Sequence, residues 1–419
     1  MNYTHLEDLL SDLYALRREE IKLGLEHTIK LLDVCDNPQN YFDSIHIAGT
    51  NGKGSTGKMI ASIFRQSGYM TGHYTSPHLV KFNERININN RNIPDSYIID
   101  FMAKYQAKIS EINATYFEVI TAMAFSYFKD NDIDLAIIET GLGGRLDSTN
   151  IIKPNIVVFT PISLDHREIL GDSLEKISIE KAGIIKKEAP VISSMQTNKA
   201  KKVLEQASII KDVNIKFINP KLITHVELFE TGTHYCYKGQ KYFIPIVGDF
   251  QAENAVLAIE AALLYNPNLA MLKIKRGLAK SYWLGRLQKI NSKPTIYYDV
   301  SHNKQGIVKI LSNLKKIHLG KISGIIALKG DKELDLICNT LRGQFKSLSF
   351  VSDKNGLLMN ELDLYNKMES FGIHGTAFQS FDIAIKKCVA ELKGDEIGLI
   401  FGSHYLASEV FDYFHFPFD

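Results

Sequence analysis

The sequence predicts an α/β protein with two domains, a larger N-terminal one with a mostly parallel sheet and a smaller C-terminal one. The chain has 419 residues, more than one ordinary hydrophobic core accommodates. Short apolar runs at residues 135–138, 156–159 and 191–192 alternate with helical patterns. Buried parallel strands have this pattern, because crossover helices cover both faces of their sheet. We place the domain boundary in a stretch without clear periodicity, which gives domains of residues 1–288 and 289–419.

The N-terminal domain begins its sheet with a strand, a glycine-rich loop and a helix in direct succession. The apolar segment 44–48 runs into Ile-Ala-Gly-Thr-Asn-Gly-Lys-Gly-Ser-Thr at residues 47–56. Such a loop lets backbone N–H groups approach phosphate oxygens, and Lys53 adds a positive charge. The strict P-loop pattern has glycine where Ile47 stands and serine or threonine where Gly54 stands. The stretch therefore predicts a variant phosphate loop in a P-loop-type domain, and the alternative is an ordinary glycine-rich turn.

A small antiparallel portion comes next, and then the α/β alternation restarts. Residues 211–247 contain short strand-like runs, beginning with residues 213–218, which we expect to pair antiparallel. A helix is expected to start near Gln251. From residue 294 onward, the pattern predicts a smaller, Rossmann-like α/β domain. Its expected strands are residues 295–300, 324–328, 347–351 and 397–401.

The composition excludes several classes of protein. Lys and Arg number 49 against 47 Asp and Glu, a net charge of +2, which argues against a nucleic-acid binder driven by bulk charge. The four cysteines lie far apart without a Cys-x-x-Cys pair, so neither a metal–thiolate site nor a disulfide framework is expected. No apolar run approaches the roughly 18 residues that a membrane span needs. We expect a cytoplasmic protein that binds neither nucleic acid nor membrane, and nothing in the sequence demands more than a monomer.

Polar residues follow several of the expected strands, at the edge where ligands of doubly wound sheets gather. Glu139 directly follows residues 135–138, His166 comes shortly after residues 156–160, and Ser76 lies in Thr-Ser-Pro-His. Magnesium takes about six mostly oxygen ligands, so a carboxylate and a hydroxyl suit it, whereas imidazole is a less usual ligand. The alternatives are a capping or ion-paired glutamate, a solvated histidine and a simple Ser-Pro turn.

Three further polar residues are interpreted from their positions in the sequence. Lys181, in Ile-Glu-Lys-Ala-Gly, fits an ordinary helical lysine. Asp299 and His302 lie at the end of the first C-terminal strand, in Tyr-Asp-Val-Ser-His-Asn. An aspartate there could accept hydrogen bonds from a ribose, and the histidine could simply start a helix.

A set of short motifs occurs in a fixed order along nearly the whole chain. They are TNGKGS at residues 50–55, TSPHL at 75–79, YFE at 116–118, GLGGRLD at 141–147, LDH at 164–166, EKAGI at 180–184, GRLQ at 285–288 and DVSHN at 299–303. In these motifs the chain resembles the folylpolyglutamate synthases, in particular the bacterial bifunctional dihydrofolate synthases/folylpolyglutamate synthases of the Mur ligase superfamily. The resemblance extends from about residue 21 to residue 409, and the ordered set is far more specific than any one motif.

The resemblance implies an ATP-dependent amide ligase that joins L-glutamate to dihydropteroate and to reduced folates. The γ-phosphate of ATP would convert a substrate carboxylate, a poor electrophile, into an acyl phosphate that the glutamate amine attacks. Lys53 and magnesium would disperse the charge on the transferring phosphoryl group. The alternatives are folylpolyglutamate synthase activity only, another Mur-type amino-acid ligase, or a P-loop kinase or nucleotide-switched regulator without ligase activity.

The resemblance also assigns roles to single residues. It implies that a carbamylated Lys181 joins the metal site, since a carbamate is an anion, and that a monovalent cation such as K⁺ takes part. Catalysis would require the two domains to close across the nucleotide. The implied catalytic residues are Lys53, Glu139, His166, Lys181 and His302; those for ATP are Asn51, Gly52, Lys53, Gly54, Ser55, Asn254, Arg286 and Asp299; those for magnesium are Ser76, Glu139 and His166.

The implied pterin site combines three segments of the chain. Its residues are Lys22, Leu23, Gly24, Leu25, Thr115, Tyr116, Phe117, Glu118, Leu146, Asp147 and Ser148. Two of them depart from the family pattern, because Lys22 stands where an acidic residue is expected and Ser148 where alanine is expected. His302 and Ser403 are the candidates for the glutamate pocket.

Overall fold

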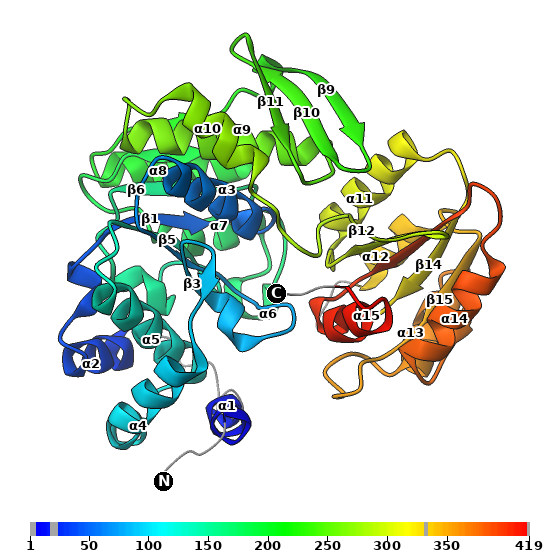
Figure 1. Cartoon of the computed structure of the whole chain (residues 1–419), viewed down its shortest axis with the longest axis horizontal. Coiled ribbons are helices and arrows are strands. Elements are labelled where there is room, and N and C mark those ends of the chain that lie inside the picture. The colour runs from blue at the N-terminus through cyan, green and yellow to red at the C-terminus, as the bar shows by residue number, and fades with distance from the viewer. Residues whose placement is uncertain (1–5, 17–23, 331–333, 417–419) are drawn as a thin grey trace. The chain divides into compact units, whose positions relative to one another are not determined.

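The computed structural model describes residues 6–16, 24–330 and 334–416. The chain divides into two compact units (Figure 1), the first made of Met1–Leu222 and Glu253–Lys280 and the second of Ile223–Ala252 and Ser281–Asp419. The expected boundary between residues 288 and 289 falls inside the second unit, so the domain assignment stays a prediction.

The first unit contains an eight-stranded sheet in the order β4-β3-β2-β5-β1-β6-β7-β8. Its strands are β1 (Asp43–Ala48), β2 (Thr71–Tyr74), β3 (Ile86–Ile88), β4 (Arg91–Asn92), β5 (Leu135–Glu139), β6 (Ile156–Phe159), β7 (Val191–Ser193) and β8 (Ile215–Phe217). All neighbours from β2 to β8 pair parallel, and β3 and β4 extend the β2 edge antiparallel. Central strands β5 and β6 are buried along their whole length, as expected for strands covered on both faces.

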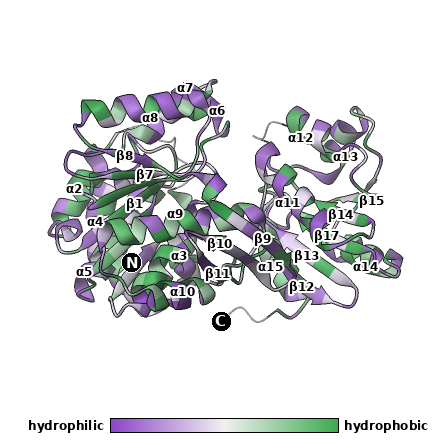
Figure 2. Ribbon diagram, turned by 90° about the horizontal axis from the view of Figure 1, so that it is seen from above, coloured by the Kyte–Doolittle hydropathy of each residue, from purple (hydrophilic) through white to green (hydrophobic). Residues whose placement is uncertain are grey.

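Helices cover this sheet on both sides. They are α1 (Leu6–Ala15), α2 (Glu26–Val34), α3 (Lys53–Gln66), α4 (Asp95–Ile112), α5 (Tyr116–Asp130), α6 (Arg167–Leu170), α7 (Leu174–Ala182), α8 (Asn198–Ile210), most of α9 (Asp249–Tyr265) and α10 (Met271–Ala279). Apolar residues of α2, α4 and α5 form one core with β5, and those of α7 and α8 form another with β6. Helix α3 packs against α10 and the strands beside it. Figure 2 shows hydrophobic strands between helices whose surfaces alternate between apolar and polar stripes.

The second unit contains two sheets. A six-stranded sheet has the order β12-β13-β17-β14-β15-β16, and a three-stranded sheet has the order β11-β10-β9. The strands are β9 (Ile223–Phe229), β10 (Gly232–Tyr237), β11 (Gln240–Ile244), β12 (Gln288–Ser292), β13 (Thr295–Asp299), β14 (Ile322–Ile326), β15 (Ser347–Phe350), β16 (Thr376–Ala377) and β17 (Ile397–Phe401). The helices are α11 (Lys304–Ile317), α12 (Leu334–Leu341), α13 (Glu361–Glu369), α14 (Phe381–Glu391) and α15 (Ala407–Tyr413).

Short 3₁₀ helices connect several of these elements. They are η1 (Pro38–Asn40), η2 (Phe82–Arg85), η3 (Ser148–Ile151), η4 (Pro220–Leu222) and η5 (His404–Leu406). In the described ranges, no helix combines the length and the apolar character that crossing a membrane requires.

The predicted α/β class, with a mostly parallel sheet, an antiparallel portion and a second α/β sheet, is confirmed. One detail is wrong: residues 213–218 do not belong to the antiparallel portion. Strand β8 pairs parallel with β7, from Val191 opposite Ile215 to Ser193 opposite Phe217. The antiparallel sheet starts only at Ile223.

Candidate active site

The carboxyl ends of four neighbouring parallel strands meet at one edge of the first sheet. Strand β1 lies between β5 and β6, with Ile47 opposite Glu139 and Ala48 opposite Phe159. Strand β2 lies on the other side of β5, with Tyr74 opposite Ile138. The loops that leave these strands therefore start side by side. They include the phosphate loop, Ser76 and His166, and Glu139 is the last residue of β5.

The phosphate loop has the backbone geometry that an anion site needs. Gly52 has φ of +94° and directly precedes α3, so the free N–H groups of the first helical turn lie behind the loop. A Cβ atom on Gly52 would stand 2.7 Å from Asn254 Oδ1, so the predicted nucleotide residue Asn254 packs against this loop. Among the described residues, the buried hydroxyls of Ser55 and Thr56 have no hydrogen-bond partner. The phosphate loop thus leads into a helix start with two buried hydroxyl groups for which the described residues provide no hydrogen-bond partner.

Hydrogen bonds connect the phosphate loop to the segment that follows β6. The N–H of Thr50 donates to the carbonyl of Pro161 over 2.9 Å. The hydroxyl of Thr50 donates to the carbonyl of Ser163 over 3.0 Å and accepts from the N–H of Ser163 over 3.0 Å. These bonds connect the phosphate loop to the segment that leads to His166.

Lys53 and Glu139 form the central charge pair of this edge. Lys53 Nζ lies 3.7 Å from Glu139 Oε1 and donates to the carbonyl of Gly49 over 3.3 Å. Glu139 is buried, and its other carboxylate oxygen accepts from the hydroxyl of Thr75. Sequence reasoning missed Thr75, although it directly precedes Ser76 in a motif already singled out.

Lys181 is buried in α7 near the same pair. Burial, and then the positive charge of Lys53, lower its pKa to about 7, while Asp165 and Asp147 act in the opposite direction. A lysine with this pKa is a nucleophile near neutral pH, because much of it is the free amine. The expectation of a chemically special Lys181 therefore has a physical basis beyond the motif.

The remaining two metal candidates lie at the same edge but are more exposed. Ser76 is half-buried in the loop after β2. His166 starts α6 in a left-handed conformation with φ of +50°, and its Nε2 lies 4.0 Å from Asp165 Oδ1. The described part of the chain holds no group of three or more His, Cys, Asp and Glu side chains suited to a metal. The predicted set includes a serine, so its metal ligation stays a prediction.

The expected pterin residues lie around the start of α5. Thr115 and Glu118 form a capping box there, with Glu118 Oε2 accepting from the N–H of Thr115 over 2.6 Å. Tyr116 is buried with its ring centre 5.7 Å from that of Tyr14 and with the Arg85 guanidinium 5.6 Å above it. This is an aromatic and cationic environment of the kind a flat ring system favours.

Other members of that set have different surroundings. Phe117 contacts the ring of Tyr74, with centres 6.1 Å apart, and a Cβ on Gly141 would collide with it. Gly24 and Leu25 directly precede α2, Leu146 is half-buried, and Ser148 is buried. Lys22 and Leu23 lie outside the described residues.

Asp147 belongs to a buried hydrogen-bond chain that sequence reasoning did not detect. Its carboxylate accepts from the N–H of Leu142 over 2.8 Å, from the N–H of Thr149 over 3.0 Å and from the Thr149 hydroxyl. Since that hydroxyl proton is used, His46 Nε2, 2.8 Å away, must carry the proton and donate to Thr149 Oγ1. Burial lowers the pKa of His46 to about 3, so the ring is neutral. This chain ties strand β1 to the glycine-rich loop after β5.

Replacing Thr149 by valine should therefore destabilise the fold. Valine has the shape of threonine but leaves the His46 N–H and one Asp147 oxygen with fewer partners, which costs about 1–3 kcal/mol. Urea unfolding followed by far-UV circular dichroism measures this cost. Thr376→Val, on the exposed strand β16, is the matched control and should change the free energy of unfolding by less than about 0.5 kcal/mol. Equal effects of the two variants would refute the role of this chain.

The second unit has its own group of predicted residues at the carboxyl end of β13. Asp299 is buried and accepts from the N–H of Leu287 over 2.7 Å and from the N–H of Ser301 over 2.7 Å. Burial raises the pKa of Asp299, and the charge of Arg286 opposes this shift. His302 Nδ1 lies 3.1 Å from the carbonyl of Val300. Asp299 and Arg286 thus lie near each other, and their contact with a nucleotide stays a prediction.

Ser403 lies at the carboxyl end of the neighbouring strand. Strand β17 is paired with β13, with Phe401 opposite Asp299. Ser403 is buried, accepts from the N–H of Tyr405 over 3.1 Å as the cap of η5, and offers its carbonyl to the Tyr298 hydroxyl at 2.9 Å. The capping role explains the serine without any ligand.

A parallel sheet whose central strand leads into a glycine-rich loop and a helix start defines a nucleotide-binding α/β protein of the P-loop type. Residues 47–262 match the family model of the Mur ligase middle domain. The chain is 34% identical over 368 residues to folylpolyglutamate synthase of Lacticaseibacillus casei, covering 84% of this chain and 85% of that protein. It is 30% identical over 427 residues to dihydrofolate synthase/folylpolyglutamate synthase of Bacillus subtilis, covering 97% and 99%.

Solved structures agree with these relatives. Folylpolyglutamate synthase of Mycobacterium tuberculosis complexed with ADP matches with a TM-score of 0.90 and 28% identity, over 99% of this chain and 100% of that one. FolC of E. coli in complex with DHPP and ADP matches with a TM-score of 0.88 and 26% identity, over 99% of both chains. The chain belongs to the dihydrofolate synthase/folylpolyglutamate synthase family of Mur-type ligases. The resemblance predicted from the motifs is confirmed.

Proposed function

We propose that this chain is an ATP-dependent amide ligase that joins L-glutamate to dihydropteroate, giving dihydrofolate, and to reduced folates, giving folylpolyglutamates. Family membership over nearly the full length supports the reaction class. The observation that carries the proposal is the Lys53–Glu139 pair, 3.7 Å apart, where the phosphate loop of β1 meets the end of β5. A lysine and a carboxylate at a phosphate loop are the parts that phosphoryl transfer from a nucleotide needs.

The residues of the phosphate loop fit a nucleoside triphosphate. The N–H groups at the start of α3 and the hydroxyl of Ser55 would bind phosphate oxygens. Lys53 would turn from Glu139 toward the transferring phosphoryl group and stabilise its charge. Asn51, Gly52 and Gly54 would let the backbone approach the phosphates closely. The neighbouring Asn254 would contact the nucleotide as well.

The acyl phosphate would form when the substrate carboxylate oxygen attacks the γ-phosphorus and ADP leaves. The glutamate amine would then add to the activated carbonyl, phosphate would leave with its bonding electrons, and the amine would lose a proton. The residues around the site would hold the two reactants in line and keep water from the acyl phosphate. His302 is proposed as a catalytic residue, and His302 and Ser403 as contacts of the glutamate.

Magnesium is proposed to be held by Ser76, Glu139 and His166. The chemistry of these donors fits, because two of the three are oxygen ligands and one is a buried carboxylate at a phosphate site. When bound, magnesium would neutralise phosphate charge. The Thr75 hydroxyl donates a hydrogen bond to the Glu139 carboxylate and so orients it. Residues next to metal ligands commonly act in this way. A monovalent cation such as K⁺ remains part of the proposal without assigned ligands.

Lys181 is proposed to be carbamylated, and its pKa gives a test. The unfolded chain keeps this lysine protonated up to about pH 10.5, whereas the folded chain releases the proton near pH 7. The unfolded state then binds more protons between these values, so the free energy of unfolding should rise with pH there, by up to about 1.4 kcal/mol per pH unit. The difference between wild type and Lys181→Met, measured by urea unfolding in carbon-dioxide-free buffer, isolates this contribution.

Carbon-13 bicarbonate provides the second arm of that experiment. Carbamylated wild type should show a carbamate signal that Lys181→Met lacks, and an electron-density map of the protein with metal and nucleotide should show the added group. An unmodified ammonium in such a crystal, or identical pH dependence of the two proteins, would refute the assignment.

The folate substrate is proposed to lie at the start of α5 and on the loop after β5. The ring would pack near Tyr116 and Phe117, with Leu146 and Ser148 beside it. Thr115, Glu118 and Asp147 would act mainly by holding these segments in shape, since their side chains cap α5 and close the loop. The remaining proposed contacts are Lys22, Leu23, Gly24 and Leu25.

In the second unit, Arg286 and Asp299 are proposed to contact the nucleotide. A buried aspartate with an adjacent arginine could accept from ribose hydroxyls while the guanidinium stacks on a base or binds phosphate. We further propose that the protein works in the cytoplasm as a monomer, with small molecules as its partners.

One assay tests the function. Purified protein with ATP, magnesium and L-glutamate should release phosphate only when dihydropteroate or a reduced folate is added, and mass spectrometry should find the glutamylated product. Phosphate release with a muramyl substrate would favour another Mur-type ligase, and a phosphorylated product without an amide would favour a kinase. Reaction with reduced folates but not dihydropteroate would restrict the activity to folylpolyglutamate synthesis.

A further inference from the structure

The turn that carries Arg286 has a strained backbone. Gly285 and Leu287, on either side of Arg286, both have left-handed backbones, with φ of +66° and +42°. Glycine adopts this conformation freely, whereas the Cβ atom of leucine makes it unfavourable. Among the described residues other than glycine, Leu287 is the only apolar one with such a backbone. Strain of this kind persists only where surrounding contacts enforce it, and it is often found at functional sites.

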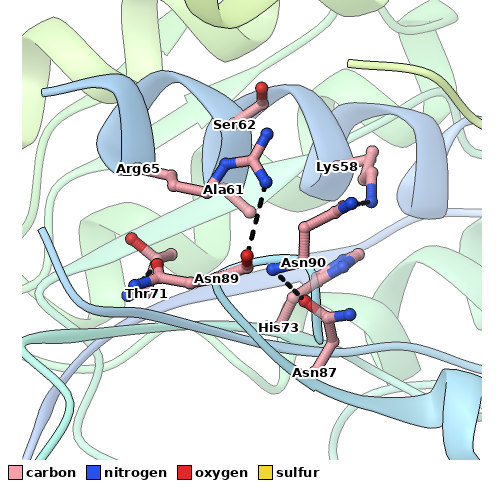
Figure 3. Close-up of a pocket in the computed structure, with 9 residues that line it drawn as sticks. All are labelled: Lys58, Ala61, Ser62, Arg65, Thr71, His73, Asn87, Asn89 and Asn90. Atoms are coloured by element: carbon pink, nitrogen blue, oxygen red, sulfur yellow. Dashed lines mark hydrogen bonds between the residues drawn. The ribbon is translucent and has the colours of Figure 1, made fainter. Parts of the chain in front are cut away.

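Another left-handed turn of the chain is built without this strain. In the turn between β3 and β4 the left-handed residues are Asn89 and Asn90, and asparagine tolerates this backbone well. Figure 3 shows their side chains bonded to neighbouring groups: Asn89 Oδ1 accepts from the N–H of Thr71 over 3.1 Å, and Asn90 Oδ1 accepts from Lys58. Residues 285–287, called the Arg286 turn below, instead have leucine at the strained position, so other contacts must hold it there.

Burial of Leu287 and the carboxylate of Asp299 hold the strained residue in place. The Leu287 side chain is fully buried in the core of the second unit, together with Tyr297 and Phe401 of the six-stranded sheet. Its N–H donates to Asp299 Oδ2 over 2.7 Å. A change of Leu287 to an ordinary backbone conformation would disturb both contacts, so they stabilise the turn against its strain.

Gln288 holds the other end of the Arg286 turn. It is the first residue of β12, its side chain is buried, and its Oε1 accepts from the N–H of Gly285 over 2.8 Å. Because that N–H is a donor, the amide oxygen must face it, and Nε2 is left buried without a hydrogen-bond partner among the described residues. A buried amide with one unsatisfied end is unfavourable. Packing alone therefore does not explain a glutamine at this position, whereas its bond to the turn does.

Arg286 lies between these two fixed residues, and most of its donors are unused. Its side chain is half-buried, and its Nη1 donates to the carbonyl of Gly285 over 3.2 Å. The same carbonyl accepts from the N–H of Val300 over 3.1 Å. In the described part of the chain, this is the only hydrogen bond of the guanidinium, which has five N–H donors. The turn thus fixes the backbone around Arg286 and leaves most of its donors for solvent or a ligand.

We propose that Gln288 is a positioning residue for nucleotide binding. By accepting from the N–H of Gly285, it keeps the Arg286 turn in the shape that directs the guanidinium to the nucleotide. Asp299 and the buried Leu287 hold the other end, so Arg286 is in place before the nucleotide arrives. Gln288 acts through Arg286 and not through a ligand contact of its own. This inference rests on the proposed function, in which Arg286 contacts ATP.

Isothermal titration of the full chain with ADP and magnesium tests the role of Gln288. Gln288→Met keeps the size of the side chain but removes the acceptor, and it should weaken ADP binding at least about five-fold. In steady-state assays it should raise the KM for ATP more than it lowers kcat. Gln379→Met changes an exposed glutamine of the same unit and should leave the ADP affinity unchanged.

A double-mutant cycle separates positioning from a general structural effect. Arg286→Ala should weaken ADP binding at least about ten-fold, since it removes a charged donor from the nucleotide. In the Arg286→Ala background, Gln288→Met should change the ADP affinity by less than about two-fold, because the residue through which Gln288 acts is gone. Equal effects of Gln288→Met in both backgrounds would overturn the proposal. Wild-type ADP affinity in either single variant would overturn it as well.

A crystal structure of wild type with ADP covers the case in which Gln288→Met fails to fold. It should show Gln288 Oε1 on the N–H of Gly285 and the Arg286 guanidinium on the nucleotide. A guanidinium on the nucleotide with the Gln288 amide turned away from Gly285 would overturn the proposal. A protein that binds ADP as expected but forms no glutamate amide would refute the proposed reaction and leave the role of Gln288 standing. An active ligase with unchanged ADP affinity in Gln288→Met would do the reverse.

Discussion

Replacing Lys53 by alanine should lower the turnover of the glutamate ligase reaction by about a thousand-fold or more. Lys53 is the cation at the phosphate loop, and its Nζ lies 3.7 Å from Glu139 Oε1 and 3.3 Å from the carbonyl of Gly49. Losing a charge aimed at the transferring phosphoryl group typically costs this much, and a thousand-fold loss corresponds to about 4 kcal/mol in the activation barrier. Phosphate release with ATP, magnesium, L-glutamate and dihydropteroate measures it.

The control must separate lost chemistry from lost structure. Lys176→Ala removes an exposed lysine that pairs with Asp172 on the surface, and it should keep wild-type turnover. The melting temperature of Lys53→Ala should remain near that of wild type, because Glu139 keeps the Thr75 hydroxyl as a partner. A folded Lys53→Ala protein with more than a tenth of wild-type activity would remove this lysine from the reaction.

The central strands of both sheets can be predicted from local sequence, because fully buried parallel strands are apolar throughout. Residues 135–138 and 156–159 are apolar runs of this kind and correspond to β5 and β6. Strand β2 cannot be predicted in this way, because Thr-Gly-His-Tyr contains no apolar run. Every residue in this strand is nevertheless buried. Burial by long-range packing leaves no local signal in such a segment.

The partner of a short strand is harder to predict than the strand itself. Strand β8 is partly exposed and precedes three strands that do pair antiparallel, so its local pattern matches theirs. Its true neighbour, β7, is separated from it by helix α8. Pairing depends on which edge the chain reaches after the helix, and neither propensity nor period encodes that.

In the candidate site, too, some features can be predicted from the sequence and others cannot. The rule that ligands gather at the carboxyl ends of parallel strands is enough to predict that Glu139, Ser76 and His166 share one edge of the sheet. The hydrogen-bond chain from His46 to Asp147 has no such signal, because His46 and Thr149 are 103 positions apart in the sequence. Motifs mark Asp147 as important, whereas only the contacts indicate how it holds its loop.

Replacing Glu139 by alanine should lower turnover by at least about a hundred-fold and increase the magnesium concentration needed for half-maximal activity. The physical reason is that this buried carboxylate has two roles. It balances Lys53 before nucleotide binds, and in our proposal it holds the metal when Lys53 turns to the phosphates. A purely structural role would affect stability and leave the magnesium dependence unchanged, so the magnesium titration discriminates between the two.

The comparison needs a variant that removes a negative charge elsewhere in the same unit. Glu205→Ala, on α8, removes a half-exposed carboxylate that pairs with Lys201 across one helical turn, and it should match wild type in both turnover and magnesium requirement. Glu139→Gln keeps the hydrogen bond from Thr75 but loses the charge, so it should recover stability without recovering the magnesium affinity. If Glu139→Ala reaches wild-type turnover at saturating magnesium with an unchanged midpoint, the carboxylate does not hold the metal. The charge of Lys53 would then need another partner during the reaction, and the carbamate proposed at Lys181 would be the next residue to examine.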